Sequence, residues 1–390
     1  MRILQVHNYY KFAGGEDVVV EAEKEMLSDY GHTVFQYTKN NREIKSIWDK
    51  VKLLLFSHYS NASYREFFQV LRDFEPDIVH VHNIFPLITP SIFKACKKLN
   101  IPVVMTLHNY RIFDPSAYLL KRGKLYDEIL YKSALRSIFY KPYRNSYLQS
   151  AVLAFNIEFH KMRDTWNKDV DVFIALTEFS RRKFIEGGID SSKIFVKPNF
   201  CREEKVDLFE SRNPGNYFLF VGRLSEEKGV LNLLKTWDAI SDFKLVIIGD
   251  GPLKSEVESC QNESIVYLGK KKHDEVLEYI KDAKALIFPS EWYETFGMVL
   301  IEALSIGTPV IVANIGSQKE IIRNNYTGLH YKAGDSESLK RAVYHLYSDD
   351  TMRHEMSENA KKEYSEKYTV GVNVKTLMSI YEFALTRNTE

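Results

Sequence analysis

Short runs of apolar, β-branched and aromatic residues alternate along the chain with longer stretches of helical periodicity. This alternation predicts β–α–β units and parallel sheets. Four runs in the first half are expected to be strands of one sheet: Arg2 to His7, Asp77 to His82, Pro102 to Leu107 and Asp171 to Leu176. Five runs in the second half are expected to form another sheet: Asn216 to Val221, Lys244 to Ile248, Ile265 to Leu268, Ala285 to Phe288 and Pro309 to Val312.

Helical periodicity fills the stretches between these strands. The expected helices are Asp17 to Asp29, Val230 to Ile240, Leu253 to Ser259, Asp274 to Lys281, Gly297 to Ile306 and Thr369 to Thr386. A polar stretch bracketed by prolines, Pro198 to Gly215, separates the two series and is the expected linker. At 390 residues the chain is long enough for two domains that each bury a core.

Composition narrows the class of protein. A net charge of +1 argues against a nucleic-acid-binding protein, because phosphate neutralisation needs an excess of cations. Cys96, Cys201 and Cys260 are odd in number and far apart, which argues against disulfides and zinc sites and favours a reducing cytosol. We expect no signal peptide, because the N-terminal sequence MRILQVHNYYK has no apolar core of sufficient length. We expect no membrane span, since the most apolar stretch, Phe296 to Ala313, contains Glu302 and a proline.

Two carboxylates stand out at the start of the expected helix Gly297 to Ile306. Glu294 and Glu302 are eight positions apart, so Glu294 falls at the helix N-terminus and Glu302 about two turns further along. A helix N-terminus binds anions through its free N–H groups and its dipole. The N–H groups at this end belong to Phe296, Gly297, Met298 and Val299. A phosphate bound here would leave both carboxylates to accept hydrogen bonds from sugar hydroxyls.

The segment Pro289 to Ala313 resembles the E-x7-E motif of retaining glycosyltransferases of the GT-B fold, in particular family four. The resemblance implies two tandem Rossmann-like parallel-sheet domains with an interdomain cleft. It places Glu294 beside the transferred hexose and Glu302 on the donor ribose. The structural alternative is an exposed Glu at a helix N-terminus and a second Glu on a solvated stripe.

The resemblance also implies domain limits. Residues 1–198 would form the acceptor-side domain and residues 199–369 the nucleotide-sugar domain. The last helix, at about residues 370–388, would pack back on the first domain.

The segment Phe220 to Gly229 resembles the family's pyrophosphate-binding loop. Arg223 and Lys228 would then stabilise the charge that develops on a diphosphate leaving group. Arginine suits bidentate contact with phosphate oxygens, and lysine acts as a point charge. Taken alone, the segment is also compatible with a solvated loop of mixed charge.

Two features of the first domain also resemble the family. Gly14 and Gly15 precede the expected helix Asp17 to Asp29 and would let the backbone approach donor phosphate, although a plain tight turn fits equally. His108 follows the expected strand Pro102 to Leu107 and would orient donor and acceptor, as a neutral imidazole can. For His7 we favour a structural role.

We expect no metal and no cofactor beyond the donor substrate. A D-x-D sequence at Asp169 to Asp171 runs into an expected strand, and we assign it a structural role. His80 and His82 share one face of a strand, but no Cys or carboxylate completes a ligand set at a recognisable spacing. We interpret them as a core or cleft-wall pair.

The stretch from Lys121 to Tyr147 combines basic residues with tyrosines. It contains an expected helix, Glu128 to Tyr140, on which Ile129, Leu130, Ala134 and Ile138 share a face flanked by Lys132 and Arg136. Such a helix either packs its stripe on its own domain or lies on an anionic bilayer. The second alternative would make residues 121–147 a peripheral membrane contact.

The sequence therefore predicts a cytoplasmic, metal-independent, retaining glycosyltransferase. It would move a hexose from a nucleotide diphosphate sugar, a UDP-sugar rather than a GDP-sugar, to a glycan or lipid-linked glycan of cell-surface polysaccharide synthesis. It could also be peripheral on the inner face of the membrane. The alternatives are a sugar-nucleotide 2-epimerase, which needs further acid and base groups, and a non-catalytic nucleotide-sugar-binding protein.

Overall fold

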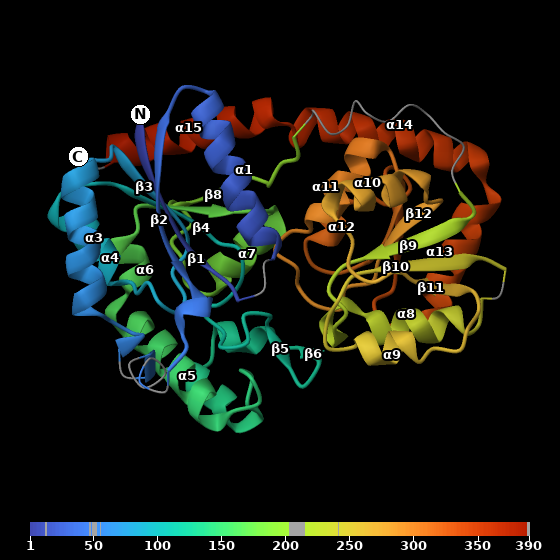
Figure 1. The fold of residues 1–390 in the computed structure, drawn as a ribbon, viewed down its shortest axis with the longest axis horizontal. Helices are drawn as coiled ribbons and strands as arrows, with labels where there is room; N and C mark the ends of the chain where they lie inside the picture. The colour runs from blue at the N-terminus through green and yellow to red at the C-terminus, as the bar shows by residue number, and fades with distance from the viewer. Residues whose placement is uncertain are drawn as a thin grey trace. The chain divides into compact units, whose positions relative to one another are not determined.

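A computed structural model describes residues 1–11, 14–46, 48, 53–54, 56–202, 215–240 and 242–387 (Figure 1). The chain divides into two compact units. Unit 1 contains Met1–Pro198 and Asn373–Glu390, and unit 2 contains Asn199–Val372. Most of the expected linker, residues 203–214, lies outside the described residues.

Unit 1 is built on a six-stranded sheet in the order β2-β1-β3-β4-β7-β8, in which every pair of neighbours is parallel. Its strands are β1 (Arg2–Tyr9), β2 (Thr33–Asn40), β3 (Ile78–Asn83), β4 (Val103–Thr106), β7 (Val172–Ala175) and β8 (Ile194–Val196). A two-stranded antiparallel hairpin, β5 (Leu120–Lys121) and β6 (Lys124–Leu125), lies outside this sheet.

The helices of unit 1 are α1 (Gly15–Asp29), α3 (Asn61–Phe74), α4 (Ser91–Lys98), α5 (Tyr147–Arg163), α6 (Thr165–Asp169) and α7 (Glu178–Glu186). Helix α15 (Val370–Arg387) joins them from the far end of the chain. The hydroxyl of Tyr381 on α15 lies 2.7 Å from Nδ1 of His80 on β3. The ring of Phe383 packs on Phe195 of β8, with centroids 4.8 Å apart. These contacts hold the C-terminal helix to the first sheet.

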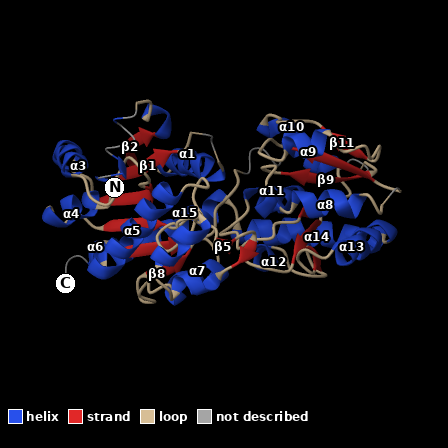
Figure 2. Ribbon diagram, turned by 90° about the horizontal axis from the view of Figure 1, so that it is seen from below, coloured by secondary structure: helices blue, strands red, loops and turns tan. Residues whose placement is uncertain are grey.

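Unit 2 contains a second six-stranded parallel sheet, in the order β11-β10-β9-β12-β13-β14. Its strands are β9 (Tyr217–Val221), β10 (Lys244–Ile248), β11 (Ile265–Tyr267), β12 (Ala285–Phe288), β13 (Val310–Ala313) and β14 (Gly328–Tyr331). Its helices are α8 (Val230–Trp237), α9 (Lys254–Glu258), α10 (His273–Asp282), α11 (Met298–Ile306), α12 (Gln318–Ile321), α13 (Ser336–Ser348) and α14 (Asp350–Lys367). Helices flank both sheets (Figure 2).

The expected fold class is confirmed, because both sheets are parallel and doubly wound. Residues on β4, β7, β12 and β13 are all buried, which explains why these strands appear in the sequence as unbroken apolar runs. In the order of unit 2, β9 is the first strand in sequence and lies between β10 and β12. The chain therefore reverses its direction of travel between β9 and β12, and ligands bind at such switch points in open α/β sheets.

The prediction of a helix from Glu128 to Tyr140 is wrong. Two 3₁₀ segments stand there instead, η2 (Asp127–Leu130) and η3 (Ala134–Tyr140). The break falls at Ser133, whose Oγ accepts the N–H of Leu135, while the N–H of Ala134 donates to the carboxylate of Glu158 on α5. These side-chain acceptors replace the carbonyls that a continuous helix would use.

The expected apolar stripe of that helix is also covered. Ile129, Leu130 and Ala134 are buried within unit 1, and Ile138 packs on the cluster that Ala134 forms with Ala154 and Ile157 of α5. The side chains that would have faced a membrane thus belong to the core.

Candidate active site

Two loops meet at the switch point of the second sheet. The loop Gly222 to Gly229 follows β9, and the loop Pro289 to Gly297 follows β12, the strand paired with β9. Both leave the carboxyl ends of their strands, so they lie beside each other. The N–H of Glu291 donates to the carbonyl of Glu227 at 2.9 Å, which joins the loops directly.

Glu294 is the centre of a buried hydrogen-bonded group in these loops. Its Oε1 accepts from Nζ of Lys228, from Oγ of Ser290 at 2.7 Å and from Nε1 of Trp292 at 2.8 Å. The ammonium of Lys228 also lies 5.5 Å from the centre of the Phe288 ring and 5.6 Å from that of Trp292. Lys228 and Glu294, predicted separately from two motifs, therefore contact each other. A fixed carboxylate and a fixed ammonium stand at the switch point.

Close backbone approach explains two glycines here. Gly229 has φ +71°, and a Cβ at this position would lie 2.1 Å from the carbonyl oxygen of Pro289. Gly316 has φ +59°, and its Cβ would lie 3.3 Å from Cα of Tyr293. Gly229 therefore has no room for a side chain, and the left-handed φ of Gly316 disfavours one there.

A third loop, Gly249 to Gly251, follows β10 and was not identified from the sequence. A Cβ on Gly249 would lie 1.8 Å from the carbonyl oxygen of Gly222, and one on Gly251 would lie 2.4 Å from that of Leu224. The N–H of Leu224 donates to the carbonyl of Asp250 at 3.0 Å. The sequence signal was present, because a Gly-Asp-Gly-Pro run directly follows the expected strand Lys244 to Ile248. This loop supports the backbone on both sides of Arg223.

Arg223 differs from Lys228 in its surroundings. Its side chain is exposed, and among the described residues it makes no hydrogen bond or ion pair. It lies five positions before Lys228 in the same loop. Its five N–H donors therefore face solvent at the edge of the switch point, where a phosphate ligand can reach them.

Helix α11 begins where the sequence places it, with Gly297 as N-cap. Leu300 is the first residue whose N–H bonds back, to the carbonyl of Gly297 at 3.0 Å. The N–H groups of Met298 and Val299 have no acceptor among the described residues, as expected for a first helical turn. The side chain of Phe296 is buried and packs on Tyr368, so only its backbone is available for a ligand.

Glu302 lies on α11 with 13% of its side chain exposed, and its Oε1 is 2.9 Å from Nε2 of His273. His273 is the first residue of α10 and was not identified from the sequence. Because the two residues lie 29 positions apart on different helices, no local pattern could have indicated this contact. His273 holds the carboxylate of Glu302 in place.

In unit 1, Gly14 is the N-cap of α1 and Gly15 its first residue. A Cβ on Gly14 would meet no atom of the described residues within 4 Å. However, the N–H of Gly14 already donates to Oδ2 of Asp17 at 3.0 Å, and Asp17 also pairs with His7 at 2.7 Å. Burial and the neighbouring Asp17 carboxylate raise the pKa of Glu16 to about 8, so this second acid of the first turn is mainly uncharged at neutral pH.

His108 follows β4, with its Nε2 3.1 Å from Nδ1 of His82 on β3 and the two rings stacked. Burial and the neighbouring His82 hold the pKa of His108 well below its ordinary value. Burial likewise lowers the pKa of His82 to about 4. Both imidazoles are therefore neutral at neutral pH, and the pair shares a single proton between the facing nitrogens.

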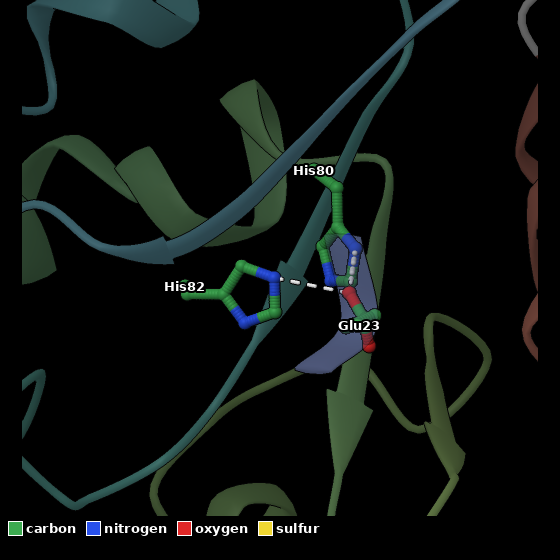
Figure 3. A group of neighbouring side chains, drawn as sticks. All are labelled: Glu23, His80 and His82. Carbon is green, nitrogen blue, oxygen red and sulfur yellow. Dashed lines mark ion pairs between the residues drawn. The ribbon is translucent and has the colours of Figure 1, made fainter. Parts of the chain in front are cut away.

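His82 in turn belongs to a fully buried cluster with His80 and Glu23 (Figure 3). Oε1 of Glu23, on α1, lies 3.0 Å from Nδ1 of His80 and 3.1 Å from Nε2 of His82. The sequence analysis found no carboxylate for these histidines, because Glu23 is some 57 residues away and comes from another element. The three groups could hold a metal ion by distance.

A cation already neutralises this carboxylate. Nζ of Lys197, with 1% of its side chain exposed, lies 3.2 Å from Oε2 of Glu23 and 2.9 Å from Oδ1 of Asn373 on α15. A divalent ion beside the ammonium would suffer strong repulsion in so buried a place. We therefore interpret the cluster as an ionic core that joins α1, β3 and α15.

A pocket of about 90 Å³ lies beside His108 within unit 1. Its polar wall contains His82, His108, Asn109 and Arg111. Its opposite wall comes from α5: Leu153, Asn156, Ile157 and His160. The guanidinium of Arg111 lies over the rings of Phe85 and Tyr143, and its Nη1 donates to the carbonyl of Pro115. A pocket with an apolar body and a few polar groups suits a small organic ligand.

Comparison with protein families shows which family has this arrangement. The family model "Glycosyl transferases group 1" matches residues 202–363, and the model "Glycosyltransferase Family 4" matches residues 13–205. The two models together span residues 13–363, and the chain belongs to the glycosyltransferases that they describe. The expected resemblance to family-four glycosyltransferases is thus confirmed.

Individual relatives align with more than half of the length of this glycosyltransferase. An uncharacterised glycosyltransferase of Methanocaldococcus jannaschii is 25% identical, with 98% of each chain covered. An uncharacterised 41.2 kDa protein encoded in the cps region of Klebsiella pneumoniae is 29% identical over 55% of this chain and 62% of that protein. The solved structure of Anabaena HepE in complex with UDP-glucose has the same fold, with a TM-score of 0.65, 17% identity and 97% and 100% of the two chains covered.

Two further expectations concern disulfides and membrane-spanning helices. Cys96, Cys201 and Cys260 form no disulfide. None of the helices in the described ranges combines the length and apolar character needed to cross a bilayer.

Proposed function

We propose that this glycosyltransferase transfers a hexose from a UDP-sugar to an acceptor hydroxyl, with retention of configuration and without a divalent cation. The observation that carries the proposal is the group at the switch point of unit 2. There Lys228 and Arg223 supply positive charge, and the first turn of α11 supplies two N–H donors that have no acceptor in the described part of the chain. Together they match the charge that develops on a departing diphosphate.

Each residue of this group has a proposed part. Arg223 and Lys228 bind the diphosphate, and Met298 and Val299 add their N–H groups. Glu302 binds the ribose, assisted by His273, which is 2.9 Å away. Glu294, held by Ser290 and Trp292, binds the hexose.

Retention follows if the acceptor attacks the face that the diphosphate leaves. The bond between the anomeric carbon and the β-phosphate oxygen breaks, and a bond from the same carbon to the acceptor oxygen forms. The acceptor proton passes to the departing phosphate oxygen, and UDP is released. This route needs no nucleophilic side chain and no proton transfer to a protein group.

The acceptor is proposed to enter the pocket of unit 1 beside His108. His108 is a neutral imidazole there and can donate to or accept from a sugar hydroxyl. The relative from a cps region supports an acceptor in cell-surface polysaccharide synthesis. The UDP-glucose bound to the Anabaena neighbour supports a UDP-sugar donor. We place the reaction in the cytoplasm.

Calorimetric titration with UDP, GDP, UDP-glucose and GDP-mannose tests the donor. We expect UDP and UDP-glucose to bind at least tenfold more tightly than their guanosine counterparts. Tighter binding of the guanosine compounds would assign a different donor class, and no binding of any of the four would overturn the proposal. Glu302→Ala should weaken UDP binding, with Glu337→Ala, an exposed acid of α13, as the matched control.

A further inference from the structure

The pocket beside His108 is lined by a single charged side chain. Of the described residues that line it, Arg111 is the one with a permanent charge, and none is an aspartate or a glutamate. Three histidines also line it. Burial lowers the pKa of His82 and of His160 to about 4 and holds the pKa of His108 well below its ordinary value. At neutral pH this lining therefore carries one positive charge and no negative charge.

Uncharged groups hold the guanidinium of Arg111 in one orientation. Its central carbon lies 5.1 Å from the centre of the Phe85 ring and 5.2 Å from that of Tyr143. These two rings meet edge to face, with centroids 6.2 Å apart. The Nη1 of Arg111 donates to the carbonyl of Pro115, and its backbone N–H donates to Oδ1 of Asn109 at 3.0 Å. The planar cation is thus fixed before any ligand binds.

The described residues supply this cation with no counter-ion. Arg111 forms no ion pair with them, and they accept from only one of its five N–H donors, the one at Nη1. Its Nε is buried and also has no hydrogen-bond partner within the described ranges. A cation that is partly withdrawn from water without a counter-ion costs free energy. An anionic ligand would offset this cost.

Two carboxyl groups of unit 1 interact with Arg111 electrostatically without pairing with it, Asp114 and Glu16. Asp114 is occupied within its own loop. It accepts from the N–H of Ser116 at 3.1 Å, from Oγ of Ser116 and from the N–H of Leu119 at 2.8 Å. Burial and the neighbouring Asp17 raise the pKa of Glu16 to about 8, so Glu16 is mainly uncharged at neutral pH. The positive charge at the pocket therefore remains largely uncompensated.

We propose that Arg111 makes this pocket selective for acceptor sugars that carry an anionic substituent, a carboxylate or a phosphate. A fixed, planar guanidinium matches two oxygens of such a group in a bidentate manner. A neutral hydroxyl would accept one hydrogen bond and leave the charge without a counter-ion. The inference rests on the proposed function, which brings the acceptor to this pocket, and it adds the chemical class of that acceptor.

Binding of three small glycosides tests the selectivity. Saturation-transfer NMR titrations compare methyl glucuronide, methyl glucoside 6-phosphate and neutral methyl glucoside, in the presence of saturating UDP so that Arg223 and Lys228 are occupied. We expect at least one anionic glycoside to bind about tenfold more tightly than methyl glucoside, because its hydrogen bonds to Arg111 are charge-assisted. The tighter of the two identifies the anion. Equal binding of all three, or no binding of either anionic glycoside, overturns the proposal.

Two variants of Arg111 and a matched control assign the preference to this residue. Arg111→Gln removes the charge and should abolish the preference for the anionic glycoside. Arg111→Lys keeps the charge without the planar fork and should reduce the preference only in part. Arg65→Gln, at an exposed position of α3, should keep it in full. An undiminished preference in both Arg111 variants, or an equal loss in Arg65→Gln, overturns the proposal. The three-glycoside comparison on the wild type decides even if Arg111→Gln does not fold.

A further variant separates this pocket from the donor site. Arg223→Ala should keep the preference for the anionic glycoside. Loss of the preference in Arg223→Ala but not in Arg111→Gln would place the anion at the donor site and overturn the proposal. Arg111→Gln should bind UDP as the wild type does. Failure of the proposed donor function appears instead as absent UDP binding by the wild type, and the glycoside titration repeated without UDP then tests Arg111 independently.

Discussion

Lys228 donates to the same oxygen of Glu294, Oε1, that Ser290 and Trp292 also reach. The carboxylate and the ammonium thus form one unit, although they come from different loops 66 residues apart. A phosphate that binds Lys228 must share or displace Glu294. The contributions of these two residues to donor binding are therefore coupled.

The coupling separates the roles of the two glutamates. Glu294→Gln keeps the shape of the site but removes the charge that competes for Lys228, so UDP affinity should be equal or higher while turnover falls. Glu302→Ala should weaken UDP binding by about 1–3 kcal/mol, because hydrogen bonds to the ribose are lost. Calorimetry with UDP measures both effects. Equal loss of UDP affinity in the two variants contradicts the assigned roles.

Gly249→Ala tests the support of the phosphate loop. Its Cβ would collide with the carbonyl of Gly222, and φ of +153° disfavours any other residue. We expect a loss of about 3 kcal/mol or more in the free energy of unfolding. Gly123→Ala is the control, since Gly123 has φ +75° but open space around it, and should lose only about 1–2 kcal/mol. Denaturant unfolding measures the loss of unfolding free energy in each variant. Equal losses would show that the loops of Gly249 and Gly222 can move apart without further cost.

Acid should destabilise unit 1 through its buried histidines. The folded-state pKa of His82 is about 4, below its ordinary value because of burial, so the unfolded chain binds more protons between pH 6.5 and 4. The contribution of His82 to the free energy of unfolding is then fully present above pH 6.5. It is lost as the pH falls through this window, at up to about 1.4 kcal/mol per pH unit for one group.

Unfolding free energies measured from pH 7 to 4.5 check the sign and the assignment. His82→Asn should make the pH dependence shallower, whereas His345→Asn, at an exposed position of α13, should not alter it. A steeper or unchanged dependence in His82→Asn would assign the acid sensitivity to other groups.

The sequence predicted the interior strands well and the edge strands poorly. β4, β12 and β13 are buried on both faces and appear as continuous apolar runs. β2 was missed because its residues are mostly partly exposed and include Gln36, Thr38 and Lys39. β8 and β14 are short edge strands that were missed, and β14 begins with a glycine, whereas the equally short edge strand β11 was predicted.

The candidate site shows a similar division. Lys228, Glu294 and the start of α11 follow from local motifs, so their positions could be predicted. Glu23 and His273 could not be, since their partners lie on elements that only the tertiary fold brings together. The stretch from Lys121 to Tyr147 was expected to contain one helix whose apolar stripe either packs on its own domain or lies on a bilayer. Ser133 interrupts that helix, and Ile129, Leu130 and Ala134 are buried in unit 1.

The central claim is that protein cations take the part of a metal ion during departure of UDP. The most direct measurement is the rate of UDP release from UDP-glucose in EDTA, for the wild type and for Arg223→Ala, Lys228→Ala and the control Lys235→Ala. The account predicts an unimpaired rate for the wild type and the control, and a roughly hundredfold or larger decrease for the other two. A rate abolished by EDTA and restored by manganese or magnesium, or undiminished release by Lys228→Ala, would contradict it.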